Sequence, residues 1–271
     1  MGSLEVLGQY TIRRLDAFGD YCRFCGRTIA SAVRTFGSPK GLRLLLPQLY
    51  DIGTRSIPVL MVTGAFVGMV LAVQAALEFK PLGMLWRMGS VVYRSVLREL
   101  GPVLAAVMLA GRVGGGLTAE LGTMRVTEQI DALRAMGADP IRVLVVPRFL
   151  ACVLLIPVMV LYTGSTGIIG GYVISVYVYH INPADFWRYA SQQVQTFDII
   201  YGPIKSLFFG FAISLICCYK GFHCEPGAAG VGRACTRAFV TSCLAILILD
   251  LFLGMFLNTI YEIYVGVQTV L

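Results

Sequence analysis

The sequence predicts an all-α, polytopic membrane protein with about five transmembrane helices. Its 271 residues are 57% hydrophobic and only 14% charged, whereas a soluble domain carries about a quarter charged residues. The mean hydropathy is +0.75, and several apolar runs reach the roughly 18 residues that cross a bilayer as a helix. We expect a single membrane domain over residues 41–271, preceded by an amphipathic helix within residues 1–40.

The N-terminal segment carries an apolar stripe and many cations, which is typical of a helix that lies in the membrane interface. The stripe consists of Leu4, Leu7, Ile12, Leu15, Phe18, Phe24, Ile29 and Val33, and the cations are Arg13, Arg14, Arg23, Arg27 and Arg34. Gly37 and Pro39 are expected to end this helix. A loosely ordered tail is the alternative.

Five apolar runs follow, and each predicts one span. They cover about residues 57–77, 91–109, 149–179, 199–219 and 238–261. Gly64 and Gly68 in the first span have the small-xxx-small spacing that allows close helix packing. A connector over 78–90 and a loop over 180–196, with a short helix, are expected on one side of the membrane. A glycine-rich loop over 220–236 is expected on the other side.

The distribution of Lys and Arg orients these spans. Eight lie between Arg13 and Arg55, five between Arg112 and Arg148, and three between Lys220 and Arg237. The opposite side receives Lys80, Arg87, Arg94 and Arg188. The positive-inside rule places the N-terminus and the richer segments inside. The net charge of +7 therefore reflects topology, and we expect no nucleic-acid partner.

A polar insert separates the second and third spans. Residues 119–137 alternate charged and apolar residues at helical spacing, which predicts one amphipathic helix that docks a soluble partner. Its charged residues are Glu120, Arg125, Glu128, Asp131 and Arg134. Gly137 and Pro140 are expected to end it. The preceding Gly111–Gly116 segment lacks the Gly-Lys-Ser/Thr ending of a phosphate loop, so we interpret it as a flexible junction.

Besides Arg94 near the outer end of the second span, four charged residues fall inside the predicted spans. Arg98 and Glu99 precede a Gly-Pro pair in the second span, where they either line a substrate cavity or reach headgroups from near a helix end. Lys205 in the fourth span is expected to pair with Asp250 of the fifth span or with Glu99. Charged side chains in spans are costly unless they are paired or hydrated, so these residues are candidates for a functional site.

Metal and catalytic motifs are weak. Cys22 and Cys25 form a lone pair, and the second cysteine-rich cluster only partly meets zinc spacing; it consists of Cys217, Cys218, His223, Cys224 and Cys235. The sequence contains no His-Glu-x-x-His and no Gly-x-Ser-x-Gly motif. We expect no metal site, no catalytic residue and no disulfide framework.

Several motifs together resemble the MlaE/YrbE permease family. They lie at Leu97 to Val103, Ala110 to Gly114, Thr118 to Met124, Glu128 to Leu133, Asp139–Pro140 and Pro147–Arg148. The resemblance covers about residues 48–250, and it is most specific between Arg98 and Arg148.

This resemblance implies the membrane subunit of an ABC system that moves phospholipid between bacterial inner and outer membranes. It implies a homodimer in which each copy docks a cytoplasmic ATPase through the helix between spans two and three. That ATPase would bind ATP-Mg, and this chain would carry no cofactor. A periplasmic MCE-domain lipid-binding protein and, in many such systems, a STAS-domain protein complete the assembly. Arg98, Glu99 and Lys205 match positions that line the family's cavity. Similar permeases occur in the chloroplast inner envelope, which is the alternative to the bacterial inner membrane.

Two other functions remain open at this point. One is an intramembrane enzyme that would use Glu99, Glu120, Asp131 and Lys205 as acid–base groups. The other is a scaffold that anchors a lipid-trafficking complex without carrying substrate. Activity of the isolated chain would favour the enzyme, whereas lipid crosslinking to a cavity would exclude the scaffold.

Overall fold

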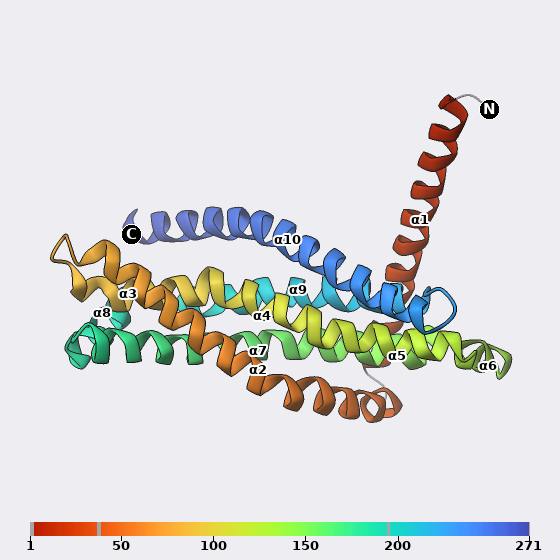
Figure 1. The fold of residues 1–271 in the computed structure, drawn as a ribbon, viewed down its shortest axis with the longest axis horizontal. Helices are drawn as coiled ribbons and strands as arrows, with labels where there is room; N and C mark the ends of the chain where they lie inside the picture. Colours follow the sequence, from red (N-terminus) through yellow and green to blue (C-terminus); the bar gives the residue numbers. More distant parts are fainter. Residues whose placement is uncertain (1–2, 37–38, 194–195, 271) are drawn as a thin grey trace.

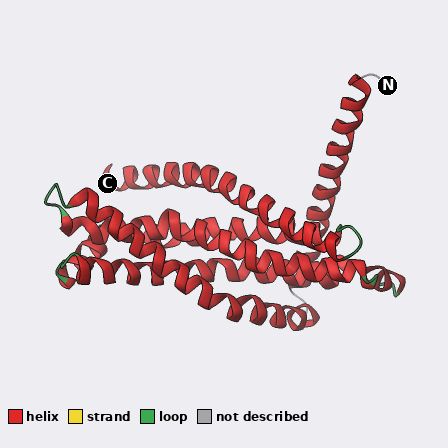
Figure 2. Cartoon of the chain, viewed as in Figure 1, coloured by secondary structure: helices red, strands yellow, loops and turns green. Residues whose placement is uncertain are grey.

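The computed structural model describes residues 3–36, 39–193 and 196–270, and within these ranges the regular structure is entirely helical (Figure 2). The long helices are α1 (Ser3–Phe36), α2 (Pro39–Phe79), α7 (Val146–Val173), α9 (Thr196–Phe222) and α10 (Ala228–Val270). The shorter helices are α3 (Met88–Ser95), α4 (Gly101–Leu109), α5 (Gly115–Val126), α6 (Gln129–Ala135) and α8 (Pro183–Gln193).

Among the described residues, five helical stretches are long and apolar enough to cross a membrane. They are Arg43–Phe79, Leu85–Val126, Ile141–Val178, Phe197–Phe222 and Ala228–Ile263. The chain is therefore an all-α, multi-pass membrane protein, as the sequence predicts. Each stretch extends past the predicted span at one or both ends, because the helix continues through the charged residues that flank the apolar run.

The second span is one continuous rod assembled from several helical segments. A 3-10 turn (Leu85–Arg87) precedes α3, and π-helical turns at Val96–Leu100 and Ala110–Gly114 join α3, α4 and α5. The predicted flexible junction at Gly111–Gly116 is therefore wrong, since that segment is helical throughout. Glycine lowers helix propensity by only about 1 kcal/mol per residue, and packing against the neighbouring helices compensates for this.

The long helices lie side by side as a bundle (Figure 1). The α3 and α8 helices mark one end, which the charge distribution assigns to the outside, and α6 marks the inside end. Figure 1 also shows α10 diverging from the bundle toward its C-terminus, and α1 leaving the inside end at a steep angle to the long helices. This direction suits a helix that lies along a membrane surface.

The α1 helix is attached to the bundle by its second half. Phe24 is buried, and its ring centroid lies 5.5 Å from that of Tyr219 and 5.8 Å from that of Phe222, both on α9. Nearer the N-terminus, Leu15 and Phe18 are 64% and 66% exposed. The sequence correctly predicts this helix, and its location in the membrane interface stays a prediction.

The first and third spans pack backbone to backbone. A Cβ atom built on Gly68 of α2 would overlap the carbonyl oxygen of Gly167 on α7, and one built on Gly64 would overlap that of Thr163. These contacts confirm the close packing predicted from the Gly64–Gly68 spacing. Helices approach this closely only where side chains are missing.

Two predicted elements differ from the structure at the inside end. The helix expected over 119–137 is broken into α5 and α6, because Glu128 adopts a left-handed conformation with φ of 59°. The predicted stop at Gly137 is confirmed, since this glycine has φ of 75°. The inside loop is shorter than the predicted 220–236, because α10 already begins at Ala228.

We predict that Gly68→Ala destabilises the protein by about 3 kcal/mol, because the added methyl group forces α2 away from the α7 backbone. Gly232→Ala is the matched control, since a Cβ there meets nothing within 4 Å; the control should be neutral or stabilising by up to about 1 kcal/mol. Thermal unfolding of the purified chain in detergent measures both, and equal unfolding temperatures for the two variants would contradict the packing argument.

Candidate functional site

A buried lysine joins three spans. The Lys205 ammonium on α9 lies 2.7 Å from Glu99 Oε2 of the second span and 2.7 Å from Asp250 Oδ1 of α10. Lys205 is fully buried. The sequence left open which carboxylate pairs with Lys205, and in the structure both do. Paired ions are the arrangement that makes a charge tolerable inside a span.

A second ion pair lies beside the first. Arg98 donates from Nε to Asp198 Oδ1 at the start of α9, and Arg94 Nε lies 3.9 Å from the same oxygen. The Asp198 side chain is 1% exposed and that of Arg98 is 11% exposed. Arg98 is therefore held inside the bundle rather than reaching out from a helix end. Asp198 is not among the site residues predicted from the sequence, and Arg94 is predicted only as part of the outside flank. An acidic residue at the start of an apolar run, such as Asp198, could have indicated a buried ion pair.

Two tyrosines complete the cluster. The Arg98 guanidinium lies 5.2 Å from the ring centroid of Tyr201 and 4.5 Å from that of Tyr261, and Lys205 Nζ lies 5.0 Å from the Tyr201 ring. The Tyr201 hydroxyl donates to the Gly254 carbonyl oxygen at 3.3 Å. Cation–π contacts of this kind stabilise desolvated cations, so α10 contributes both a carboxylate and an aromatic wall.

The local backbone explains why Arg98 and Glu99 are placed here. They lie in the π-helical turn Val96–Leu100. Pro102 has no N–H to donate to the carbonyl of Arg98, four residues earlier, and the widened turn accommodates this loss. Such turns inside α-helices are frequent at functional sites.

The cluster as a whole is electrically balanced but not closed. Three cations (Arg94, Arg98 and Lys205) face three carboxylates (Glu99, Asp198 and Asp250). The Glu99 side chain remains 46% exposed and that of Asp250 23% exposed. A half-exposed carboxylate beside a span is costly against hydrocarbon, so it indicates a polar surface or a covered cavity on this side of the helix.

The inside end carries the predicted docking residues. Asp131 of α6 pairs with Arg125 at 2.7 Å and with Arg134 at 3.0 Å, and all three side chains are at least one-third exposed. Glu128 occupies the exposed turn between α5 and α6. These residues form one charged surface at the end of the bundle, and its role in docking a soluble partner stays a prediction.

Glu120 has a different environment from the other four. Its carboxylate accepts hydrogen bonds from Arg148 of α7, with Nη2 at 3.0 Å and Nε at 3.3 Å. Arg148 is buried, whereas the Glu120 side chain is 47% exposed. Glu120 therefore braces the second span against the third, which sequence analysis did not anticipate when it placed Glu120 with the docking residues.

The docking element is anchored to the bundle by apolar packing. Ile130 of α6 is fully buried and belongs to a cluster with Leu121 of α5, Phe222 of α9 and Phe24 of α1. Arg134 also lies 5.6 Å from the ring centroid of Phe222. The α6 helix is therefore packed against the second and fourth spans and against α1.

The cysteines of the described residues are free thiols. Within the described ranges, no group of three or more His, Cys, Asp or Glu residues could hold a metal ion. Burial raises the pKa of the Cys25 thiol on α1, which keeps it protonated and weakly nucleophilic. In the loop, hydrogen bonding to Arg233 and the charges of Arg233 and Arg237 lower the pKa of the Glu225 carboxyl.

Comparison with known proteins adds independent information. The family model described as Permease MlaE matches residues 45–256. A probable ABC transporter permease of Rickettsia conorii is 41% identical over 242 residues, which are 89% of this chain and 92% of the relative. The intermembrane phospholipid transport system permease protein MlaE of Haemophilus influenzae is 37% identical over 79% of this chain and 82% of its own length. The chloroplast protein TRIGALACTOSYLDIACYLGLYCEROL 1 of Arabidopsis thaliana is 39% identical over 79% of this chain and 61% of its own length.

We predict that Lys205→Met destabilises the protein by about 3 kcal/mol, because it leaves Glu99 and Asp250 facing each other without their cation. Adding Asp250→Asn to Lys205→Met should restore part of the loss, since it removes one of the two unpaired charges. Thermal unfolding in detergent measures both variants. An unchanged stability of the single variant would show that the triad does not hold the three spans together.

Proposed function

The chain belongs to the MlaE permease family, and from this premise we propose that it is the membrane permease subunit of an ABC transporter that moves phospholipid between two membranes. The names of the relatives support this proposal, since one is named a probable ABC transporter permease and another a phospholipid transport system permease. Within this chain we assign transport rather than catalysis, with ATP-Mg bound and hydrolysed by a separate subunit.

The buried charge cluster carries the proposal. Charged side chains are kept inside a membrane domain where a polar ligand or a pathway needs them. Glu99 and Asp250 leave the cluster partly open, and Arg98 provides a guanidinium that matches a phosphate group. We propose that Arg98, Glu99 and Lys205 line the cavity through which the headgroup passes, while apolar neighbours accept the acyl chains.

The coupling step follows from the continuity of the second span. An ATPase bound to Arg125, Glu128, Asp131 and Arg134 would move α6 when it closes on ATP. Ile130 connects α6 to the bundle, and the helical rod from Leu85 to Val126 carries the displacement to Arg98 and Glu99. We propose that this motion changes the shape of the cavity and transfers the lipid.

We propose a homodimer because Glu99 is unusually exposed for a charged side chain within a span. A carboxylate that is 46% exposed on the side of a span would contact hydrocarbon unless a second copy or a water-filled cavity covers it. The further proposed partners are a periplasmic MCE-domain lipid-binding protein and a STAS-domain protein that binds the ATPase.

We propose the bacterial inner membrane as the location. Support comes from the two bacterial relatives, which match 89% and 79% of this chain. The relative from Arabidopsis makes the chloroplast inner envelope the alternative. Cell fractionation with markers for each membrane distinguishes the two.

We expect the native chain to co-purify with an ATPase and the Glu128→Arg/Asp131→Arg variant to lose it, because both substitutions reverse charge on the α5–α6 surface. Glu225→Arg is the matched control, since Glu225 also pairs with two arginines near the inside end, at 2.6 Å and 3.4 Å, but lies outside that surface. Affinity purification from the native membrane with a measurement of ATPase activity tests this. Loss of the ATPase from the control alone would move the docking site to the inside loop.

We expect Arg98→Gln to lower ATP-driven lipid transfer by at least about tenfold, because it removes a charge-assisted contact with the phosphate. Arg188→Gln on the exposed α8 helix is the control and should transfer at the normal rate. Both are measured as fluorescent phospholipid transfer by the complete complex in proteoliposomes, after assembly is checked. A native complex that hydrolyses ATP without moving lipid would favour the scaffold over the permease.

A further inference from the structure

A second polar recess lies near the inside end of the bundle, away from the Lys205 cluster. It opens between α2 and the helical rod that continues into α5, and it has a volume of about 220 Å³. Four charged side chains line it, two from each helix: Asp51 and Arg55 from α2, and Arg112 and Glu120 from the second span. Neither the docking surface nor the proposed cavity includes this recess as a whole.

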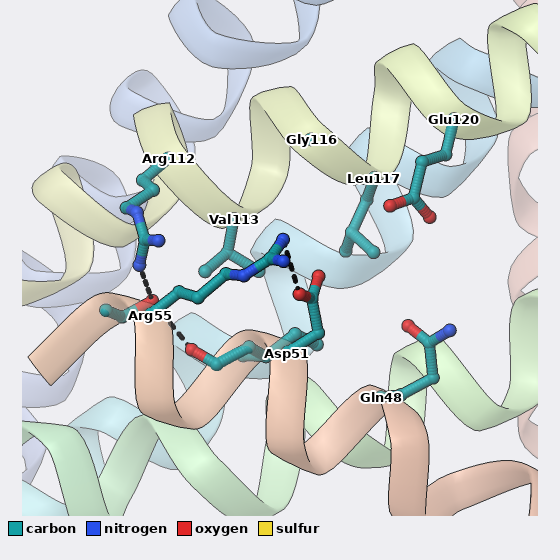
Figure 3. A pocket seen from close by; sticks show the side chains of 10 residues that line it. Gln48, Asp51, Arg55, Arg112, Val113, Gly116, Leu117 and Glu120 are labelled. Carbon is teal, nitrogen blue, oxygen red and sulfur yellow. Dashed lines mark hydrogen bonds and ion pairs between the residues drawn. The ribbon is translucent and has the colours of Figure 1, made fainter.

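Two arginines extend into the recess, one from each helix. Figure 3 shows the Arg55 side chain extending along the space between α2 and the second span, with Arg112 reaching down from the opposite side. Arg55 Nη1 lies 2.7 Å from Asp51 Oδ1, and Arg112 Nη1 donates to Ser56 Oγ at 2.7 Å. Among the described residues, each of these two guanidinium groups makes its polar contact through Nη1. Because each guanidinium has five N–H donors, several remain for a ligand.

The recess lies at headgroup level on the inside. On α2 its charged residues end at Arg55, just before the apolar run that begins at Ile57. On the second span they begin at Arg112, just after the apolar run that ends at Leu109. Both helices thus change from apolar to charged at the same level, which is where a bilayer changes from acyl chains to headgroups.

A separate apolar groove lies farther along the same two helices, on the side of the recess that faces the middle of the membrane. It runs between the same two helices, has a volume of about 620 Å³, and is lined by Val62, Thr63, Phe66, Val67, Val70, Leu71, Gln74, Leu100 and Leu104. Val62 lies about 9 Å along α2 from Ser56, at 1.5 Å per residue. Phe66 and Val70 are 61% and 54% exposed in the groove.

We propose that this recess and groove bind one phospholipid of the inside leaflet, with the headgroup among Asp51, Arg55, Arg112 and Glu120 and an acyl chain along the groove. The polar-to-apolar order from the inside toward the membrane centre is that of such a lipid. Arg55 and Arg112 bind the phosphate, and the carboxylates of Asp51 and Glu120 face a headgroup ammonium. Phosphatidylglycerol has no ammonium for these carboxylates, so the site favours a zwitterionic headgroup, even though Glu120 also pairs with Arg148, which does not line the recess.

The recess adjoins the coupling element. Glu120 contributes to the recess and also binds Arg148 of α7, and it lies on α5, the helix that leads to the turn at Glu128. A bound headgroup therefore contacts the same helix as the docked ATPase. The role of the site in loading the transporter rests on the proposed function, whereas binding of the lipid itself does not.

Photocrosslinking of the full chain tests the proposal. A benzoylphenylalanine at Gly116 places the probe in the recess, and one at Gly232 of α10 is the control; a Cβ at either position meets nothing within 4 Å. The chain is reconstituted in vesicles of phosphatidylethanolamine and phosphatidylglycerol, with one of the two lipids radiolabelled at a time. We expect Gly116 to crosslink phosphatidylethanolamine in preference to phosphatidylglycerol, and Gly232 to crosslink both in proportion to their abundance.

Arg55→Gln/Arg112→Gln should lower the Gly116 crosslink by at least about tenfold, because it removes both phosphate contacts. The matched control is Arg43→Gln/Arg142→Gln, which removes the same charge from exposed positions and should leave the crosslink unchanged. Loss of the crosslink on adding millimolar inorganic phosphate would identify a free anion as the ligand and overturn the lipid assignment. Crosslinking of Gly116 to a second copy of the chain, preference for phosphatidylglycerol, or an undiminished crosslink in the Arg55/Arg112 variant would also overturn the proposal.

These outcomes separate the site from the function. If the complex transfers lipid but the Gly116 crosslink does not depend on Arg55 and Arg112, the inside-leaflet site is wrong and the permease function stands. If the crosslink depends on these arginines but the native complex moves no lipid, the site stands and the transport function is wrong.

Discussion

The arrangement of the spans depends on how one buried ammonium is compensated. Lys205 on α9 is fully buried, and its partners Glu99 and Asp250 come from the second and fifth spans, each at 2.7 Å. A cation in this position is tolerated only with such partners, so the lateral order of three helices is tied to one side chain. The first and third spans depend instead on glycines that let their backbones touch, as at Gly68 and Gly167.

The continuity of the second span connects the two ends of the molecule. Arg98 and Glu99 lie in one π-helical turn, and a second such turn precedes α5, yet the helix does not end before Val126. At the inside end, Glu120 is fixed to Arg148 of α7 and Ile130 is buried against α9 and α1. The α6 helix is therefore fixed to the bundle, and the break at Glu128 sets its angle to α5.

The polar residues of the chain occur at two levels of the membrane domain. The outer level consists of Arg98, Lys205 and the carboxylates that pair with them, and the exposed side of Glu99 leaves it partly open. The inner level lies between α2 and the second span, where Arg55 and Arg112 line the polar recess, and a separate apolar groove lies farther along the same helices. Both levels include residues of the second span. In a transporter built from this chain, the coupling helix, the inner recess and the central charges would therefore move together.

The sequence by itself determined the class, the span count and the identity of Arg98, Glu99, Lys205 and Asp250 as charges within the spans, because hydropathy is a local property. The orientation stays a prediction from charge asymmetry. Only the tertiary structure decided that Lys205 binds both carboxylates, that Asp198 compensates Arg98, and that Glu120 braces α7. These pairings join residues about 28 to 106 positions apart, and spacing along a chain carries no information on which helices are neighbours. Likewise, the left-handed turn at Glu128 and the helical Gly111–Gly116 segment depend on packing that overrides local propensity.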